Sequence, residues 1–166
     1  MPAPRPDCLP IDEVLKTVMG VENDVNHFYD LATATTGDEE ASRLFALLRS
    51  DMRSGAESVK NVCADFTCGS ATLEGASDED LQFLSVLAET GFYSRSLRPE
   101  QLAETGLPTV NLLDNALQLE RDLMLFYMKF FGVSCARHRP VFSDLIARGQ
   151  KHMTELNNLH RRLKQR

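Results

Sequence analysis

Apolar residues recur at helical spacing along most of this chain, and no segment shows the alternation that is typical of a β-strand. Each apolar stripe occupies one side of its segment, as in helices that bury one face against a shared core. We therefore expect an all-α fold. The pattern predicts four long helices, over about Ile11–Ala34, Glu39–Ala64, Thr109–Phe131 and Pro140 to the C-terminus.

Breaks in the pattern set the order of these helices. Thr36-Gly37-Asp38 separates the first two, and Gly132 is expected to end the third. A long connection, Cys68–Pro108, joins the second helix to the third, and its sequence indicates no role. Within it we expect a short helix over Ser77–Glu89, opened by a capping box, and a second turn from Pro99. This order is that of a four-helix bundle with one long crossover.

Two segments that begin 98 residues apart repeat one another. The residues from Val21 to Tyr29 and those from Leu119 to Tyr127 share Glu, Asp, Phe and Tyr in the same order. In each copy a glutamate, Glu22 or Glu120, interrupts the apolar stripe. A carboxylate aimed into a helical core is costly unless something compensates it. The repeated pair therefore suggests a shared metal site between duplicated halves.

The composition limits the classes of binding partner that are expected for this chain. The net charge is −6, and no basic block precedes the last turn, which argues against nucleic acid. No apolar run reaches about 18 residues, so no membrane partner is expected. Residues 1–10 carry prolines and no apolar core of a signal peptide, which predicts a flexible tail before a single domain over 11–166.

The four cysteines are Cys8, Cys63, Cys68 and Cys135, and no two have the Cys-x-x-Cys spacing of a metal knuckle. Reduced thiols in a cytoplasmic protein are the simplest account. Cys63 and Cys68 lie close in sequence. They either form a thiol pair at a helix end or act as small, partly buried apolar residues.

A second pair of positions begins 29 residues after each glutamate. These pairs are Asp51-x-x-Ser54 in the first half and Gly149-x-x-His152 in the second. Residues three apart share one helix face, so Glu-x-x-His at such positions can grip one ion. The first pair keeps a carboxylate and lacks the imidazole, and the second does the reverse. We expect the remaining polar residues to point inward at about one level: Glu22, Asp51, Glu120 and His152.

With these motifs the chain resembles the rubrerythrin branch of the ferritin-like superfamily. The matching residues are Glu22 with Phe28-Tyr29, Phe45 with Asp51, Glu120 with Phe126-Tyr127, and Ile146-Ala147 with His152. The resemblance covers the four long helices. It implies a ferritin-like bundle, often a homodimer, whose members bind two irons and reduce peroxide or react with oxygen. The rubredoxin module of that family is absent here, so the electron donor is unknown.

The resemblance implies a metal site with an incomplete ligand set, formed by Glu22, Asp51, Glu120 and His152. Iron is the first expectation, with manganese or zinc as alternatives, and at most one ion is expected to be held firmly. Two carboxylates and one imidazole are suitable ligands for such an ion and would leave some of its coordination positions open. A metal-free network of hydrogen-bonded buried charges is the alternative, which would make the chain a non-enzymatic helical module.

Tyr29 and Tyr127 each follow their glutamate by seven residues, on the same helix face. Each hydroxyl either donates a hydrogen bond to a ligand carboxylate, as outer support of a metal site, or is satisfied elsewhere in an ordinary core. The sequence leaves both interpretations open.

The segment from Leu123 to Phe131 contains one polar residue, Lys129. A helix that is apolar nearly all round must be covered on more than one side. Either a second chain or the crossover must therefore cover its outer side, including Met128 and Phe131. We expect a two-fold homodimer.

Overall fold

The computed structural model describes residues 11–67, 77–90, 98–134 and 136–166. These residues form helices and connecting turns, with no strand among them. The helices are α1 (Ile11–Thr35), α2 (Glu39–Thr67), α3 (Asp78–Thr90), α5 (Pro99–Leu102), α6 (Thr109–Val133) and α7 (Arg139–Lys164). The prediction of an all-α fold is confirmed.

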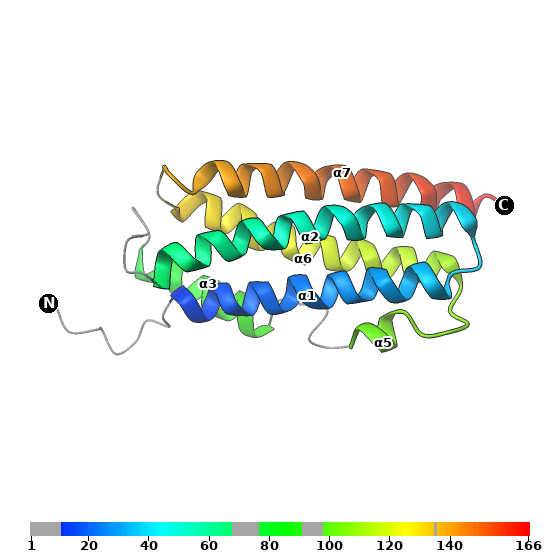
Figure 1. Ribbon diagram of the computed structural model, residues 1–166, viewed down its shortest axis with the longest axis horizontal. Helices are drawn as coiled ribbons and strands as arrows, with labels where there is room; N and C mark the ends of the chain where they lie inside the picture. Colours follow the sequence, from blue (N-terminus) through cyan, green and yellow to red (C-terminus); the bar gives the residue numbers. More distant parts are fainter. Residues whose placement is uncertain (1–10, 68–76, 91–97, 135) are drawn as a thin grey trace, which may run out of the picture.

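The four long helices lie lengthwise beside one another (Figure 1). α1 packs against α2 and α6, and α7 packs against the same two helices, which encloses the core between all four. α1 and α6 run in opposite directions (Figure 1). The crossover helices α3 and α5 contact α1, and α3 also contacts α6.

Local signals set most of the helix boundaries. Asp38 caps α2, where its Oδ1 accepts a hydrogen bond of 2.9 Å from the Ala41 amide. The capping box at Ser77 is confirmed, because Ser77 Oγ accepts from the Asp80 amide at 3.1 Å and the Asp80 carboxylate accepts from the Ser77 amide at 3.0 Å. The short helix expected at Pro99 is α5.

The prediction that Gly132 ends the third long helix is wrong. α6 continues to Val133, which is buried, as is Phe130 in the preceding turn. A glycine inside a helix costs only about 1 kcal/mol relative to alanine. Burial of these two apolar side chains outweighs that cost.

Buried positions in the two halves repeat with two different offsets. The buried residues of α1, including Glu22, match those of α6 at an offset of 98. Those of α2 match α7 at an offset of 97, as with Phe45 and Phe142. The spacing from the buried positions of α6 to those of α7 is therefore one residue shorter than the spacing from α1 to α2.

The different offset corrects the pairing of positions that was predicted from the sequence. Counterparts of the buried Gly149 and His152 are Met52 and Gly55, which are also buried. They are not Asp51 and Ser54, since Ser54 is exposed and occupies no inward ligand position.

Some predictions lie outside the described residues. These are the tail over 1–10, the side chain of Cys63, and Cys8, Cys68 and Cys135. Among the helices that the structure describes, none combines the length and the apolar character needed to cross a membrane.

Candidate functional site

A cluster of ionisable side chains lies in the middle of the bundle. Glu22 of α1, Glu120 of α6 and His152 of α7 are each at most 2% exposed. Asp51 of α2 lies at the edge of the cluster, with 35% of its side chain exposed. The two glutamates that interrupt the apolar stripes therefore do point into the core, and the structure brings all four predicted residues into one region.

Two buried tyrosines tie α1 and α6 together through this cluster. Tyr29 Oη donates to Glu120 Oε1 at 2.7 Å, and Tyr127 Oη donates to Glu22 Oε1. Each tyrosine reaches the glutamate of the other half because α1 and α6 are antiparallel (Figure 1). Burial, and then the partner carboxylate, raises the pKa of both tyrosines well above the usual range. Both hydroxyls thus remain protonated donors, and of the two interpretations that the sequence left open, the hydrogen bond to a carboxylate is the one present.

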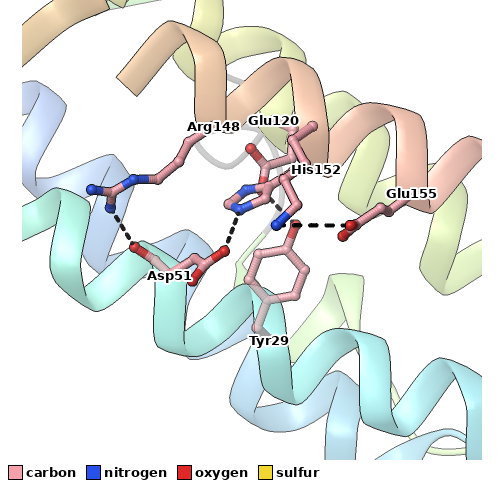
Figure 2. Close-up of polar contacts among 7 residues, drawn as sticks. Tyr29, Asp51, Glu120, Arg148, His152 and Glu155 are labelled. Atoms are coloured by element: carbon pink, nitrogen blue, oxygen red, sulfur yellow. Dashed lines mark hydrogen bonds and ion pairs between the residues drawn. The ribbon is translucent and has the colours of Figure 1, made fainter. Parts of the chain in front are cut away.

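His152 joins the cluster to α2. Figure 2 shows its imidazole between Asp51 and Glu120, with Nδ1 3.1 Å from Glu120 Oε1 and Nε2 3.2 Å from Asp51 Oδ2. Burial lowers the pKa of His152, but hydrogen bonds and charge from both carboxylates outweigh it, so the net pKa is raised. Arg148 donates to the Asp51 carbonyl oxygen at 3.0 Å and so fixes that turn of α2 (Figure 2).

Glu22 is the least compensated member of the cluster. Burial raises the pKa of its carboxyl to about 7, although the hydrogen bond from Tyr127 lowers it. Its second oxygen, Oε2, is buried and has no hydrogen-bond partner. Near neutral pH the protonated and ionised forms of Glu22 are therefore both populated.

A small cavity lies between the cluster and the α2–α7 seam. Its volume of about 10 Å³ leaves room for roughly one water molecule. The residues that line it are Asp51, Met52, Gly55, Glu120, Tyr127, Leu145, Arg148, Gly149 and His152.

Met124 fills the space beside Gly149. A Cβ atom added at Gly149 would lie 2.6 Å from Met124 Cγ and 3.1 Å from Met124 Sδ. Any side chain at position 149 would therefore require Met124 to move.

The donor chemistry of the cluster fits one transition-metal ion better than two. One imidazole and the carboxylates of Glu22, Glu120 and Asp51 are ligand types that suit iron, manganese or zinc. Among the residues that the structure describes, however, no three His, Cys, Asp or Glu side chains are arranged to hold an ion. The imidazole and the carboxylates face one another instead, so an ion would have to replace the proton between Glu120 and His152.

Sequence reasoning missed several residues of this region. Arg148, Met52, Gly55 and Met124 were not singled out. Aligning the apolar positions of the second and fourth helices separately from those of the first and third would have identified Met52 and Gly55. No pattern within one helix predicts the roles of Arg148 and Met124, because their contacts are with other helices.

Comparisons with protein-family models, with curated proteins and with solved structures found no match to this chain.

We predict that Tyr127→Phe lowers the free energy of unfolding by about 1–3 kcal/mol at pH 8, because it leaves the buried Glu22 carboxylate without any donor. At pH 5 the loss should be smaller, since Glu22 is then mostly protonated. Urea denaturation at both pH values measures this. Ser58→Ala removes an exposed hydrogen bond and is the control, with a change within about 0.5 kcal/mol. Equal losses at both pH values would contradict the role given to Glu22.

Proposed function

We propose that the bundle is ferritin-like, of the rubrerythrin type, and that it binds one transition-metal ion at the remnant of a di-iron site. Glu120 and His152 are the proposed main ligands, and Glu22 supplies a third donor. The observation that carries the proposal is the free, buried Oε2 of Glu22 in the same cluster as the Glu120–His152 pair. A buried carboxylate oxygen without a donor is costly, and a bound cation would compensate it.

The remaining residues of the cluster support this role. If Nδ1 of His152 binds the ion, Nε2 donates its proton to Asp51, which then orients the imidazole from outside. Tyr29 and Tyr127 hold the two glutamate carboxylates in place. A bound iron would supply one-electron chemistry toward oxygen or peroxide. The proposed activity is therefore redox, with an unknown electron donor.

A metal-free scaffold is the second candidate. It is supported by the closed hydrogen-bond network and by Met124, whose side chain occupies the space beside Gly149. In this interpretation the positive His152 compensates Glu120 and Asp51, and the cluster fixes the packing of the four helices. The chain would then act as a non-enzymatic interaction module.

Metal analysis separates the two candidates. We expect the purified chain, loaded anaerobically with Fe(II), Mn(II) or Zn(II) and then desalted, to retain at most one ion per chain. Asp51→Asn should weaken metal binding about 10–100-fold, which is the usual loss when a residue that orients a metal ligand is changed. Glu120→Gln removes a ligand and should weaken binding further. His27→Gln, on the exposed face of α1, is the matched control. Metal occupancy should decrease as the pH is lowered, because His152 then takes up a proton.

The outcomes of this experiment are distinct. Retention of two ions per chain would contradict the proposed loss of one half-site. Retention of none, for all three metals, would favour the metal-free scaffold. Equal binding by Glu120→Gln and the parent chain would place the ion elsewhere.

We also propose a homodimer formed through one apolar face. Among the described residues, five of the six large apolar side chains that are exposed belong to α3 and α6: Phe83, Val86, Leu125, Met128 and Phe131. Met128 and Phe131 are 52% and 40% exposed, so the described helices of the crossover, α3 and α5, do not cover them. Exposed apolar side chains that gather on two contacting helices are typical of a protein–protein interface.

Met128→Lys should convert the dimer to monomer, because it places a charge at the middle of this face. Sedimentation velocity at micromolar concentration measures the effect. Leu47→Lys, at a similarly exposed leucine on α2, is the control and should leave the assembly unchanged. A parent chain that is already monomeric would refute the homodimer.

A further inference from the structure

A groove runs along the outside of the seam between α2 and α7, separate from the central cluster. Its volume is about 350 Å³, which lies within the range of small-ligand pockets. The residues that line it are Glu40, Leu44 and Leu47 of α2 and Glu155, Asn158, Leu159 and Arg162 of α7.

Three leucines give the groove its apolar part. Leu159 is buried, Leu44 is partly buried, and Leu47 is 48% exposed. Within the described residues, Leu47 is the one large apolar side chain that is exposed away from α3 and α6. A linear aliphatic group laid along these leucines would remove apolar surface from water.

The two carboxylates of the groove differ in their partners. Glu40 forms an ion pair with Arg162, and Arg166 lies 3.7 Å from its other oxygen. Glu155 Oε1 lies 4.0 Å from Lys151 Nζ, on a lysine that is 62% exposed. Glu155 Oε2 is buried and has no hydrogen-bond partner. Glu155, which lines the groove, therefore carries one carboxylate oxygen that lacks a donor.

We propose that this groove binds a small amphipathic cation, an aliphatic chain that ends in a primary ammonium group. The ammonium group donates to the carboxylate of Glu155, and the chain covers Leu47 and Leu44. An ammonium group fits because it supplies both the missing donor and the charge opposite to the carboxylate. An anionic head group would instead face Glu155, and a neutral chain would leave Oε2 without a charged partner. This site is independent of the metal proposed at the centre of the bundle.

Titration of the full chain with n-hexylammonium chloride, followed by calorimetry and by ¹H–¹⁵N NMR, tests the proposal. We expect saturable binding, with shifted amides confined to the α2–α7 seam around Leu47 and Glu155. Hexanoate and 1-hexanol have the same chain length and should bind at least about tenfold more weakly. Glu155→Gln, which keeps the shape of the side chain, and Leu47→Ser should each weaken hexylammonium binding by a similar factor. Glu57→Gln, at an exposed carboxylate of α2, is the matched control and should bind like the parent chain.

Three outcomes would overturn the proposal. The first is no saturable binding of hexylammonium by the parent chain. The second is equal binding of hexylammonium, hexanol and hexanoate, which would indicate an apolar groove without charge selection. The third is an unchanged affinity of Glu155→Gln. Far-UV circular dichroism of each variant establishes that a weaker affinity is not caused by loss of the fold.

Discussion

His152→Leu is expected to lower the free energy of unfolding by about 3–5 kcal/mol near pH 6, as when one partner of a buried ion pair is removed. The imidazole contacts Glu120 on one side and Asp51 on the other. Leucine fills most of the same volume but leaves the buried Glu120 carboxylate with Tyr29 as its remaining donor. The loss is therefore electrostatic rather than a cavity.

The pH dependence of this loss has a definite sign. The folded-state pKa of His152 is raised above 6.5, so its stabilising contribution is complete below pH 6.5 and decreases as the pH rises through the folded-state value. The difference between the parent chain and His152→Leu should therefore be largest in mild acid and smaller at alkaline pH. Urea denaturation of metal-free protein across this range measures it.

His27→Leu provides the matched control for this experiment. His27 also contacts a carboxylate, that of Glu100, but both side chains are largely exposed. Its substitution should change stability far less and without the same pH profile. If both histidine variants behaved alike, His152 would not be the residue that compensates the central carboxylates.

Glu22→Gln is expected to gain about 3 kcal/mol of stability relative to the parent chain as the pH rises from about 4.5 to above 7. Burial raises the pKa of Glu22 from 4.5 to about 7. A raised carboxyl pKa means that the contribution of Glu22 to the stability of the parent chain is most favourable below pH 4.5 and is lost as the pH rises through 7. Glutamine does not ionise, so the variant avoids this loss.

Chemical denaturation at pH 5 and pH 8.5, with chelator present, measures this difference. The glutamine amide adds a contribution of its own, but that contribution does not vary with pH and cancels between the two conditions. Glu39→Gln, at an exposed carboxylate paired with Arg43, is the control and should leave the pH profile unchanged. A Glu22→Gln profile parallel to that of the parent would show that Glu22 has an ordinary pKa.

These two expectations bear on function because Glu22 is costly to the metal-free fold at neutral pH. A buried carboxylate that lowers stability is typical of a binding or catalytic position rather than of a scaffold. If added metal stabilises the parent chain and not Glu22→Gln, the carboxylate is a ligand. Stabilisation of both proteins to the same extent would instead place the ion on Glu120 and His152 without Glu22.

The amino-acid sequence by itself determined the helices and which residues of α1 and α6 face the core. Apolar spacing and the capping box at Ser77 are local, so they act before any two helices meet. Glu22 and Glu120 lie within apolar stripes, and a residue seven positions later returns to the same face after two turns. Burial of both glutamates, and of a tyrosine on the same face of each helix, could therefore be predicted.

The tertiary structure alone decided which residues meet at the centre. The spacing from the buried positions of α6 to those of α7 is one residue shorter than the spacing from α1 to α2, and one residue turns a helix position by about 100°. Because of that shift, the counterpart of Gly149 in the first half is Met52 and not Asp51. The counterpart of His152 is Gly55 and not Ser54. The crossed tyrosine–glutamate pairs depend on the antiparallel packing of α1 against α6. Likewise, Met124 fills the space at Gly149 because α6 and α7 approach closely there. Such contacts join residues far apart in the chain, and the apolar period within one helix carries no information about the rotation or height of the next.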